Sequence, residues 1–263
     1  MKKLSVAIAS VLFSGAAFAQ SYQSISNLEY LNVESEDNVA VDSIYYFAPK
    51  QVLGPLDQFE YINKESNIFG RISDNDYATG YNVGGEYFAD QFLVGASYSV
   101  VDPDDFDSAD QYTLSLGYLV SDNFLLKAER VDPEHGDETY FFSGRYDHAL
   151  NSTDYVGFEV RIDDEFDHRE LNGKYFKDLK QGNYLTVEAQ YINRDDADNY
   201  WQLGSNYYFN KMTSVFVNFD DEDFYNFGAK YFIDTNFAVS AGYGSNWDES
   251  SYDQWFLKAT AQF

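Results

Sequence analysis

The chain alternates apolar and polar residues in repeated segments of about ten residues. In the last of these segments Trp255, Leu257, Ala259, Ala261 and Phe263 are apolar, and most residues between them are polar. Successive side chains of a β-strand point to opposite faces, so a period of two predicts a strand with one apolar and one polar face. The same alternation occurs at 237–243, 225–231, 156–162, 112–118 and 92–98.

Thirteen strands are predicted from residue 77 onward. They cover 77–88, 91–101, 110–120, 123–131, 138–149, 152–162, 168–177, 183–192, 199–209, 212–219, 223–232, 236–244 and 251–263. Weaker alternation upstream adds 24–33, 39–48 and 56–72, for sixteen in total. An even number returns both termini to the same side, and fourteen strands, with the first hairpin packed elsewhere, is the alternative.

Two kinds of connection separate these strands and alternate along the chain. Short turns occur at 89–91, 121–123, 151–153, 210–211 and 233–235, whereas the other connections are longer and acidic. Examples of the acidic kind are VDPDDFDSAD, VDPEHGDE, DDEFDH and DDED. Short turns at one end and acidic loops at the other predict an antiparallel up-and-down meander.

Tyrosines recur just before the short turns, on the apolar face of the strands. They are Tyr87, Tyr118, Tyr146, Tyr175, Tyr207 and Tyr231. Aromatic rings with a polar tip prefer the boundary between hydrocarbon and water, so these residues predict a membrane girdle at one level.

The first residues predict export. Lys2 and Lys3 precede an apolar stretch that ends in Ala17-Phe18-Ala19, which is typical of a secretory signal peptide at 1–19 cleaved after Ala19. The predicted mature domain is then 20–263, and no later apolar run is long enough for a transmembrane helix.

Composition narrows the function classes further. The chain has no Cys, which excludes a disulfide-stapled fold, and its net charge of -27 disfavours nucleic acid as a partner. High acidity can indicate disorder, but 24 Tyr and 23 Phe predict an ordered, strand-rich chain.

A soluble β-sandwich or lipocalin-like barrel would also alternate, but its apolar face would point inward. Here the polar face is rich in Gly, Ser, Asn and charged residues, and the other face is aliphatic and aromatic. The fold class we predict is therefore all-β, a transmembrane antiparallel up-and-down β-barrel in the bacterial outer membrane, with short periplasmic turns and acidic extracellular loops.

The exported chain, the final strand WFLKATAQF, the tyrosine-closed turns and the stretch YYFAPKQVLGPLDQFEYINKES at 45–66 resemble the Gram-negative outer-membrane general porins, in particular the shorter "putative general bacterial porin" families. The resemblance implies that Trp255, Leu257 and Phe263 carry the signal read by the barrel-assembly machinery, and that a homotrimer is a candidate assembly. Large general porins constrict the channel with a long loop. No loop here is plainly long enough, so either a short loop such as 101–110 bends inward or wall side chains form the constriction.

If the apolar face meets lipid, the alternation of side chains along each strand places eleven charged residues on the lumen side. They are Glu86, Lys127, Glu129, Arg145, Glu159, Arg161, Glu170, Lys174, Glu188, Lys230 and Lys258. An ionised side chain facing the membrane midplane would cost about 2 to 4 kcal/mol. The predicted function is a water-filled channel for passive diffusion of small polar solutes and ions, with outer-membrane lipid and lipopolysaccharide around it. The acidic loops predict a modest cation preference, and a paired, poorly conducting interior is the alternative state of the lumen.

Two other functions are weaker interpretations. Asp102, Asp104, Asp105, Asp107 and Asp110 form an acidic cluster that could bind Ca²⁺, but EF-hand spacing is absent and a solvated loop is favoured. An outer-membrane enzyme is disfavoured because only three His residues occur and no G-x-S-x-G motif is present. A non-conducting scaffold or adhesin that binds a partner through its acidic loops is the main functional alternative, and no cofactor is expected.

Overall fold

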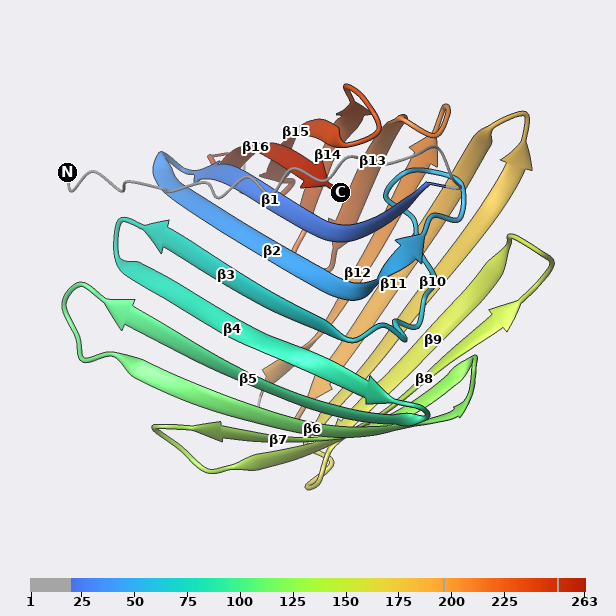
Figure 1. Cartoon of the computed structure of the whole chain (residues 1–263). Helices are drawn as coiled ribbons and strands as arrows, with labels where there is room; N and C mark the ends of the chain where they lie inside the picture. Colours follow the sequence, from blue (N-terminus) through green and yellow to red (C-terminus); the bar gives the residue numbers. More distant parts are fainter. Residues whose placement is uncertain (1–19, 196, 250) are drawn as a thin grey trace.

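The computed structural model describes residues 20–195, 197–249 and 251–263, and over these the chain is a single closed β-barrel (Figure 1). Each strand pairs antiparallel with its neighbours in sequence, and the last strand pairs with the first. Among the described residues no helix is long and apolar enough to cross a bilayer. The predicted signal peptide at 1–19 lies outside the described residues.

Sixteen strands form the barrel wall. They are β1 (Ser21–Val33), β2 (Glu36–Gln51), β3 (Asn67–Asn75), β4 (Ala78–Ala89), β5 (Phe92–Pro103), β6 (Ala109–Ser121), β7 (Phe124–Pro133), β8 (Thr139–Ala149), β9 (Tyr155–Asp163), β10 (His168–Lys180), β11 (Asn183–Arg194), β12 (Ala197–Tyr208), β13 (Thr213–Asp220), β14 (Phe224–Phe232), β15 (Phe237–Asn246) and β16 (Asp253–Gln262). The predicted number of sixteen is confirmed.

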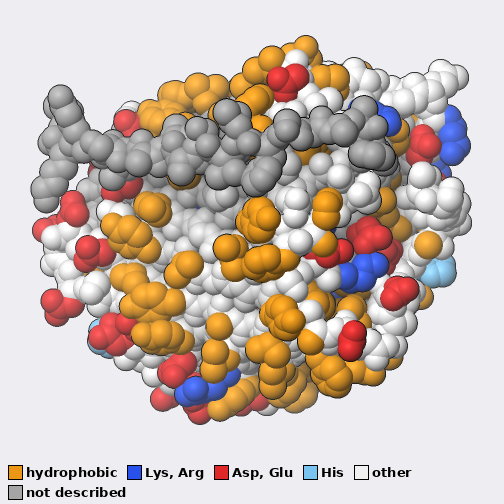
Figure 2. Space-filling view, in the orientation of Figure 1, with side chains coloured by type: hydrophobic (Ala, Val, Ile, Leu, Met, Phe, Trp, Pro, Cys, Tyr) orange, Lys and Arg blue, Asp and Glu red, His pale blue; other side chains and the backbone are white. Residues whose placement is uncertain are grey.

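The two ends of the barrel differ. We call the end that carries the connections after even-numbered strands the turn end, because it holds most of the short turns. The end with the connections after odd-numbered strands is the loop end, and it holds the predicted acidic loops. Figure 2 shows acidic side chains along the left edge of the molecule, where Figure 1 places the loop end of β1 to β6.

The outer wall is apolar by the alternation seen in the sequence. In β5 the outward residues Phe92 and Val94 are 62% and 54% exposed, whereas Leu93 between them is 1% exposed. The same contrast recurs along the other strands, and hydrophobic side chains spread over the wall in Figure 2. In a closed barrel the backbone N–H and C=O groups of each strand are hydrogen-bonded to its neighbours, so the wall leaves no open sheet edge toward lipid. This apolar surface is therefore suited to a bilayer.

The strand predicted at 56–72 is wrong. Only residues 67–75 are extended there, and the chain between Gln51 and Asn67 is irregular. This connection follows β2 and so lies at the turn end, and it is the longest connection in the described part of the chain.

Candidate functional site

The connection 52–66, which we call the inward segment, lies inside the barrel. Gly54 has a φ of 140°, a backbone conformation that favours glycine, and Pro55 follows it. Together they end the β2 ladder and start a tight turn, in which the Gln58 amide donates to the Pro55 carbonyl at 3.1 Å. The Leu53 amide donates to the Gln58 carbonyl at 2.8 Å and closes the turn.

Apolar side chains of the inward segment reach three different parts of the wall. Leu56 packs with Phe232 of β14 and Ala238 of β15. Ile62 packs with Leu119 and Leu125, on β6 and β7.

The third contact is aromatic. Leu53 and Tyr61 pack against a buried cluster of Tyr155, Phe176, Tyr184 and Tyr208, which come from the four successive strands β9 to β12. A segment that touches β6 and β7, β9 to β12, and β14 and β15 of a closed barrel lies across its bore.

Polar contacts fix the inward segment as well. Gln262 donates from Nε2 to the Leu56 carbonyl at 2.8 Å, and Gln58 donates from Nε2 to the Tyr208 hydroxyl at 2.6 Å. Lys230 Nζ lies 2.9 Å from an Asp57 carboxylate oxygen, in an ion pair that is about four-fifths shielded from solvent. Half-buried or buried pairs of this kind hold a segment in one position because each partner left alone would be desolvated and unsatisfied.

Two glycines make room for this packing. A Cβ placed on Gly157 of β9 would lie 2.5 Å from the ring of Tyr61, and one placed on Gly54 would lie 2.6 Å from the ring of Tyr184. Real Cβ atoms do not approach other atoms so closely, so only glycine permits these two contacts in the observed geometry.

Several strands have two consecutive aromatic residues near one end, which we call aromatic doublets, with one ring inside the barrel and the other on its outer face. Tyr175 and Phe176 are consecutive on β10, and Phe176 is fully buried inside while Tyr175 points outward. The same arrangement holds for Tyr207 with Tyr208 and for Tyr231 with Phe232. Only the outward member of each doublet was predicted from the sequence, and the second aromatic, at the inward position beside it, is the signal that points to the buried contacts.

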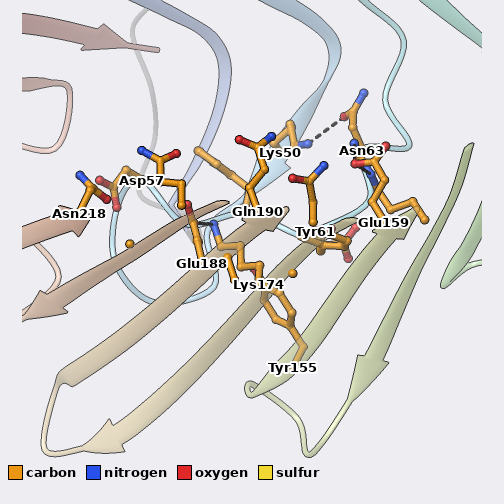
Figure 3. Close-up of a pocket in the computed structure, with 18 residues that line it drawn as sticks. Lys50, Asp57, Tyr61, Asn63, Tyr155, Glu159, Lys174, Glu188, Gln190 and Asn218 are labelled. Carbon is orange, nitrogen blue, oxygen red and sulfur yellow. Dashed lines mark hydrogen bonds and ion pairs between the residues drawn. The ribbon is translucent and has the colours of Figure 1, made fainter. Parts of the chain in front are cut away.

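A cavity of about 560 Å³ lies beside the inward segment, and Figure 3 shows the side chains around it. Its lining combines residues 57, 59, 60, 61 and 63 of the segment with wall residues of β2 and β8 to β13. Burial raises the pKa of Tyr61 to about 12, so this hydroxyl keeps its proton at neutral pH.

The charged residues predicted for the lumen are brought together in ion pairs. The pairs are Lys127 with Glu86 at 3.7 Å, Lys127 with Glu129 at 3.1 Å, Arg161 with Glu129 at 3.4 Å, Arg145 with Glu159 at 2.6 Å, Lys174 with Glu188 at 2.9 Å, Lys230 with Asp57, and Lys258 with Glu29 at 3.1 Å. Glu170 instead accepts hydrogen bonds from Asn172 and Gln190 and lies 3.8 Å from His168. Asp57 and Glu29 are partners that the sequence analysis did not name.

Glycines also shape this charged wall. Glu86 on β4 reaches Lys127 on β7 across β5 and β6, where Gly95 and Gly117 occupy the intervening inward positions. A Cβ on Gly95 would lie 2.3 Å from the Ser115 hydroxyl and 3.4 Å from Glu86 Cγ. The absence of a side chain at these glycines therefore leaves room for the Glu86 and Lys127 side chains to meet along the inner face of the wall.

The opposite part of the wall is lined by amides. Asn172, Gln190 and Gln202 are direct cross-strand neighbours on β10, β11 and β12. Asn218 of β13 follows and donates to Asn226 of β14 at 2.7 Å. Amide groups donate and accept hydrogen bonds without a net charge, so this strip is suited to contact with neutral polar solutes.

The predicted girdle tyrosines all lie near the turn end of their strands. Tyr87, Tyr231, Tyr118 and Tyr146 are 64%, 52%, 40% and 39% exposed, and the other two are half-buried. Tyr207 packs against Phe209 at 5.0 Å between ring centroids, and Lys177 Nζ lies 5.9 Å from the Tyr175 ring.

The predicted assembly residues lie on the closing strand. Trp255 and Leu257 are 40% and 53% exposed on the outer face of β16. Phe263 packs against Phe237, with ring centroids 5.5 Å apart, and its carbonyl accepts hydrogen bonds from the amides of Gln23 and Ser24. Phe263 thus contributes to the closure between the last and first strands.

The sequence left open an inward loop at 101–110 and a weak Ca²⁺ site in the same acidic stretch. The short loop 101–110 does not bend inward. Residues 101–103 and 109–110 continue β5 and β6, and Figure 1 shows the connection between these strands at the left edge of the barrel. The inward segment occupies the bore from the other end instead. Within the described residues, no group of three or more His, Asp or Glu is placed to hold a metal ion, and this includes Asp102, Asp104, Asp105, Asp107 and Asp110.

A closed sixteen-stranded barrel with an apolar outer wall, a polar lumen and a segment folded across its bore defines a transmembrane β-barrel channel of the outer membrane. The chain belongs to the family described as "Putative general bacterial porin", whose model matches residues 1–263. The family resemblance seen in the sequence is thereby confirmed.

Solved structures share the fold. The Acinetobacter baumannii outer membrane protein Omp33 is 18% identical, with 94% of this chain and 100% of that chain covered and a TM-score of 0.59. A triple mutant of the Rhodopseudomonas blastica porin is 14% identical, with 91% and 98% covered and a TM-score of 0.53. No curated protein matches the sequence.

Proposed function

We propose that this porin is a water-filled diffusion channel for small polar solutes and ions whose bore is set by the inward segment at the periplasmic, turn end. The single observation that carries this proposal is the position of residues 52–66, which contact opposite sides of the barrel wall through Leu56, Tyr61 and Ile62. A polar cavity of about 560 Å³ beside them supplies the wet part of the path.

Removal of the inward segment tests the proposal. Residues 53–65 are replaced with a short Gly-Ser linker, and single-channel conductance is measured in planar bilayers. We expect conductance to rise at least about twofold, because the narrowest cross-section of a pore limits its current.

A matched control is the same linker in place of residues 104–108, an exposed connection at the loop end. This replacement should leave conductance close to that of the unchanged protein. Equal conductance before and after removal of residues 53–65 would show that the segment does not limit the pore.

We also propose a modest cation preference. The acidic connections at the loop end contain one Lys or Arg, which is Arg194. They cover 101–110, 131–138, 163–168, 193–199, 220–223 and 246–251. The negative potential there raises the local concentration of cations within about a Debye length, ~8 Å at physiological salt.

The remaining partners follow from the outer surface. We propose that Trp255, Leu257 and Phe263 are read by the barrel-assembly machinery, that lipid and lipopolysaccharide surround the apolar wall, and that three copies can associate through it. Cross-linking in intact outer membranes, followed by gel electrophoresis, distinguishes a homotrimer from a monomer.

A further inference from the structure

We propose that the cavity beside the inward segment is a binding subsite for small amino-acid zwitterions, in which the Lys50 ammonium holds the carboxylate of the solute. The proposal rests on the proposed channel function and names the class of solute that the constriction favours.

Three basic residues line the cavity, and two of them are neutralised. Arg145 is paired with Glu159 and Lys174 with Glu188. Lys50, at the end of β2, has no carboxylate within ion-pair distance among the described residues. Figure 3 shows its amino group directed toward Asn63.

The Lys50 ammonium is held in place without being neutralised. Its Nζ donates to the Asn63 side-chain oxygen at 2.8 Å and lies 4.9 Å from the centroid of the Tyr46 ring. An ammonium has three N–H donors, and this arrangement uses one of them. The other two remain for a solute carboxylate.

Carboxylates near Lys50 lie beyond ion-pair distance. Glu60 is paired with Lys64 at 3.1 Å and Glu86 with Lys127 at 3.7 Å, so both are already partly neutralised. Glu65, in the same segment, also acts on Lys50 from beyond that distance. A solute carboxylate that binds Lys50 directly would therefore add the close partner that these groups do not provide.

A second group in the cavity lacks a partner. Tyr155, the first residue of β9, is 4% exposed, and its buried hydroxyl forms no hydrogen bond in the described structure. It lines the same cavity, and Figure 3 shows its ring directed toward Lys174. A buried polar group without a partner is rare and costly, and a bound polar solute would satisfy it.

The amide strip of Asn172, Gln190 and Gln202 completes a lining suited to the rest of such a solute. The side-chain carbonyl oxygens of these amides accept hydrogen bonds from an ammonium. The cavity therefore offers donors for a carboxylate and acceptors for an ammonium.

The charge of the loop end favours a zwitterion over a simple anion. An anion that reached Lys50 from outside would first pass the acidic connections, where it is repelled. A solute without net charge passes them at no such cost and still presents a carboxylate to Lys50.

The test compares swelling rates of proteoliposomes in L-serine and in erythritol, a neutral polyol of similar size. The unchanged protein should pass serine faster than erythritol. Lys50→Met should lower the serine rate roughly fivefold and leave the erythritol rate unchanged, because it removes one close charge at a shielded position. Lys50→Arg should retain most of the serine rate.

Two further variants separate the subsite from general effects. Lys180→Met removes a charge of the same sign at the same end of the barrel. Lys180 is exposed and paired with Asp178, and neither residue lines the cavity, so both rates should stay unchanged. Tyr155→Phe keeps the ring, removes the unpartnered hydroxyl, and should lower the serine rate alone.

Each outcome is decisive. Equal loss of both rates in Lys50→Met would indicate a change of bore and overturn the subsite, as would an unchanged serine rate. If the unchanged protein passes neither solute, the proposed channel function itself fails.

Discussion

At the scale of single residues, the bore depends on positions where the wall has no side chain. Gly157 faces the ring of Tyr61 so closely that a Cβ would lie 2.5 Å from it. Because Tyr61 also packs with Tyr155, the ring has no free direction on that side. The inward segment and the wall are therefore matched residue by residue.

Gly157→Val should displace the inward segment. Overpacking typically costs about 1 to 3 kcal/mol, and here the segment can escape the clash by moving toward the turn end. We expect faster trypsin cleavage after Lys64 in the folded, detergent-solubilised protein.

Gly173→Val is the matched control, since the nearest atom to an added Cβ there is 3.9 Å away. It should leave the cleavage rate unchanged. Identical cleavage of the Gly157→Val and unchanged proteins would show that the contact with Tyr61 does not hold the segment.

The ion pair between Lys230 and Asp57 gives a second prediction at this scale. Both side chains are about one-fifth exposed. Lys230→Met leaves the Asp57 carboxylate without its partner, and we expect the free energy of unfolding to fall by about 1 to 3 kcal/mol. Urea unfolding in lipid vesicles measures this loss.

The double variant Asp57→Asn with Lys230→Met should recover part of that stability, because the uncompensated charge is then removed. Additive losses in the two single variants and the double variant would mean that the pair contributes no coupling.

At the scale of elements, strand ends carry doublets whose two members have different tasks. Phe232 is 2% exposed and packs against Leu56, whereas Tyr231 is 52% exposed on the outer wall. Phe232→Ala should cost about 3 to 5 kcal/mol in unfolding free energy, as for other buried aromatics.

Tyr231→Ala is the neighbouring control. It removes an exposed ring, so we expect a smaller loss of stability and no change in conductance. Guanidinium unfolding in vesicles and bilayer conductance check both variants, and a conductance unaffected by Phe232→Ala would contradict a role for the doublet in holding the segment.

The strands from residue 77 onward could be predicted because each has one face against lipid, which enforces a strict period of two. The segment 56–72 could not be predicted as it is. Leu53, Leu56, Phe59 and Ile62 recur every third residue, which fits neither strand period nor helix period over a length sufficient to decide. Gly54-Pro55 was the local signal for a break in the ladder.

The candidate site was accessible to sequence reasoning only in part. Parity alone identified Arg145, Glu159, Lys174 and Glu188, which line the cavity. Asp57 was missed because its position depends on where the irregular segment folds, a long-range property that no local pattern encodes. Lys50 was missed because the predicted strand 39–48 ended two residues before it, whereas β2 continues to Gln51. Paired lumen charges were an alternative from the sequence, but which charges pair could not be predicted, since the partners follow from strand register and from the position of the inward segment.

At the scale of the whole molecule, charge is distributed unevenly along the barrel axis. The described charges of the lumen are largely paired, while acidic residues are concentrated in the connections at the loop end. The net field that an ion meets on entry is therefore set by the loop end.

The cation preference should weaken both with salt and with acid. Raising the ionic strength from about 0.1 M to 1 M shortens the Debye length from ~10 Å to ~3 Å, so reversal potentials under a KCl gradient should move toward those of a non-selective pore.

Ordinary carboxyl groups titrate near pH ~4, and acidification from about pH 6 to pH 3 should likewise abolish the preference. Glu138 is an exception, because a hydrogen bond from Arg130 lowers its pKa, so it stays charged to lower pH than its neighbours.

A variant separates the loops from the lumen as the origin of this preference. Asp104, Asp105 and Asp107 are exposed and have no ion pair to the wall in the described structure, so changing all three to Asn removes three charges without altering the bore. We expect reduced cation selectivity at low salt and an unchanged conductance at 1 M salt, where the loops are screened. A selectivity that survives both this triple substitution and high salt would place its origin in the lumen, at the paired charges beside the inward segment.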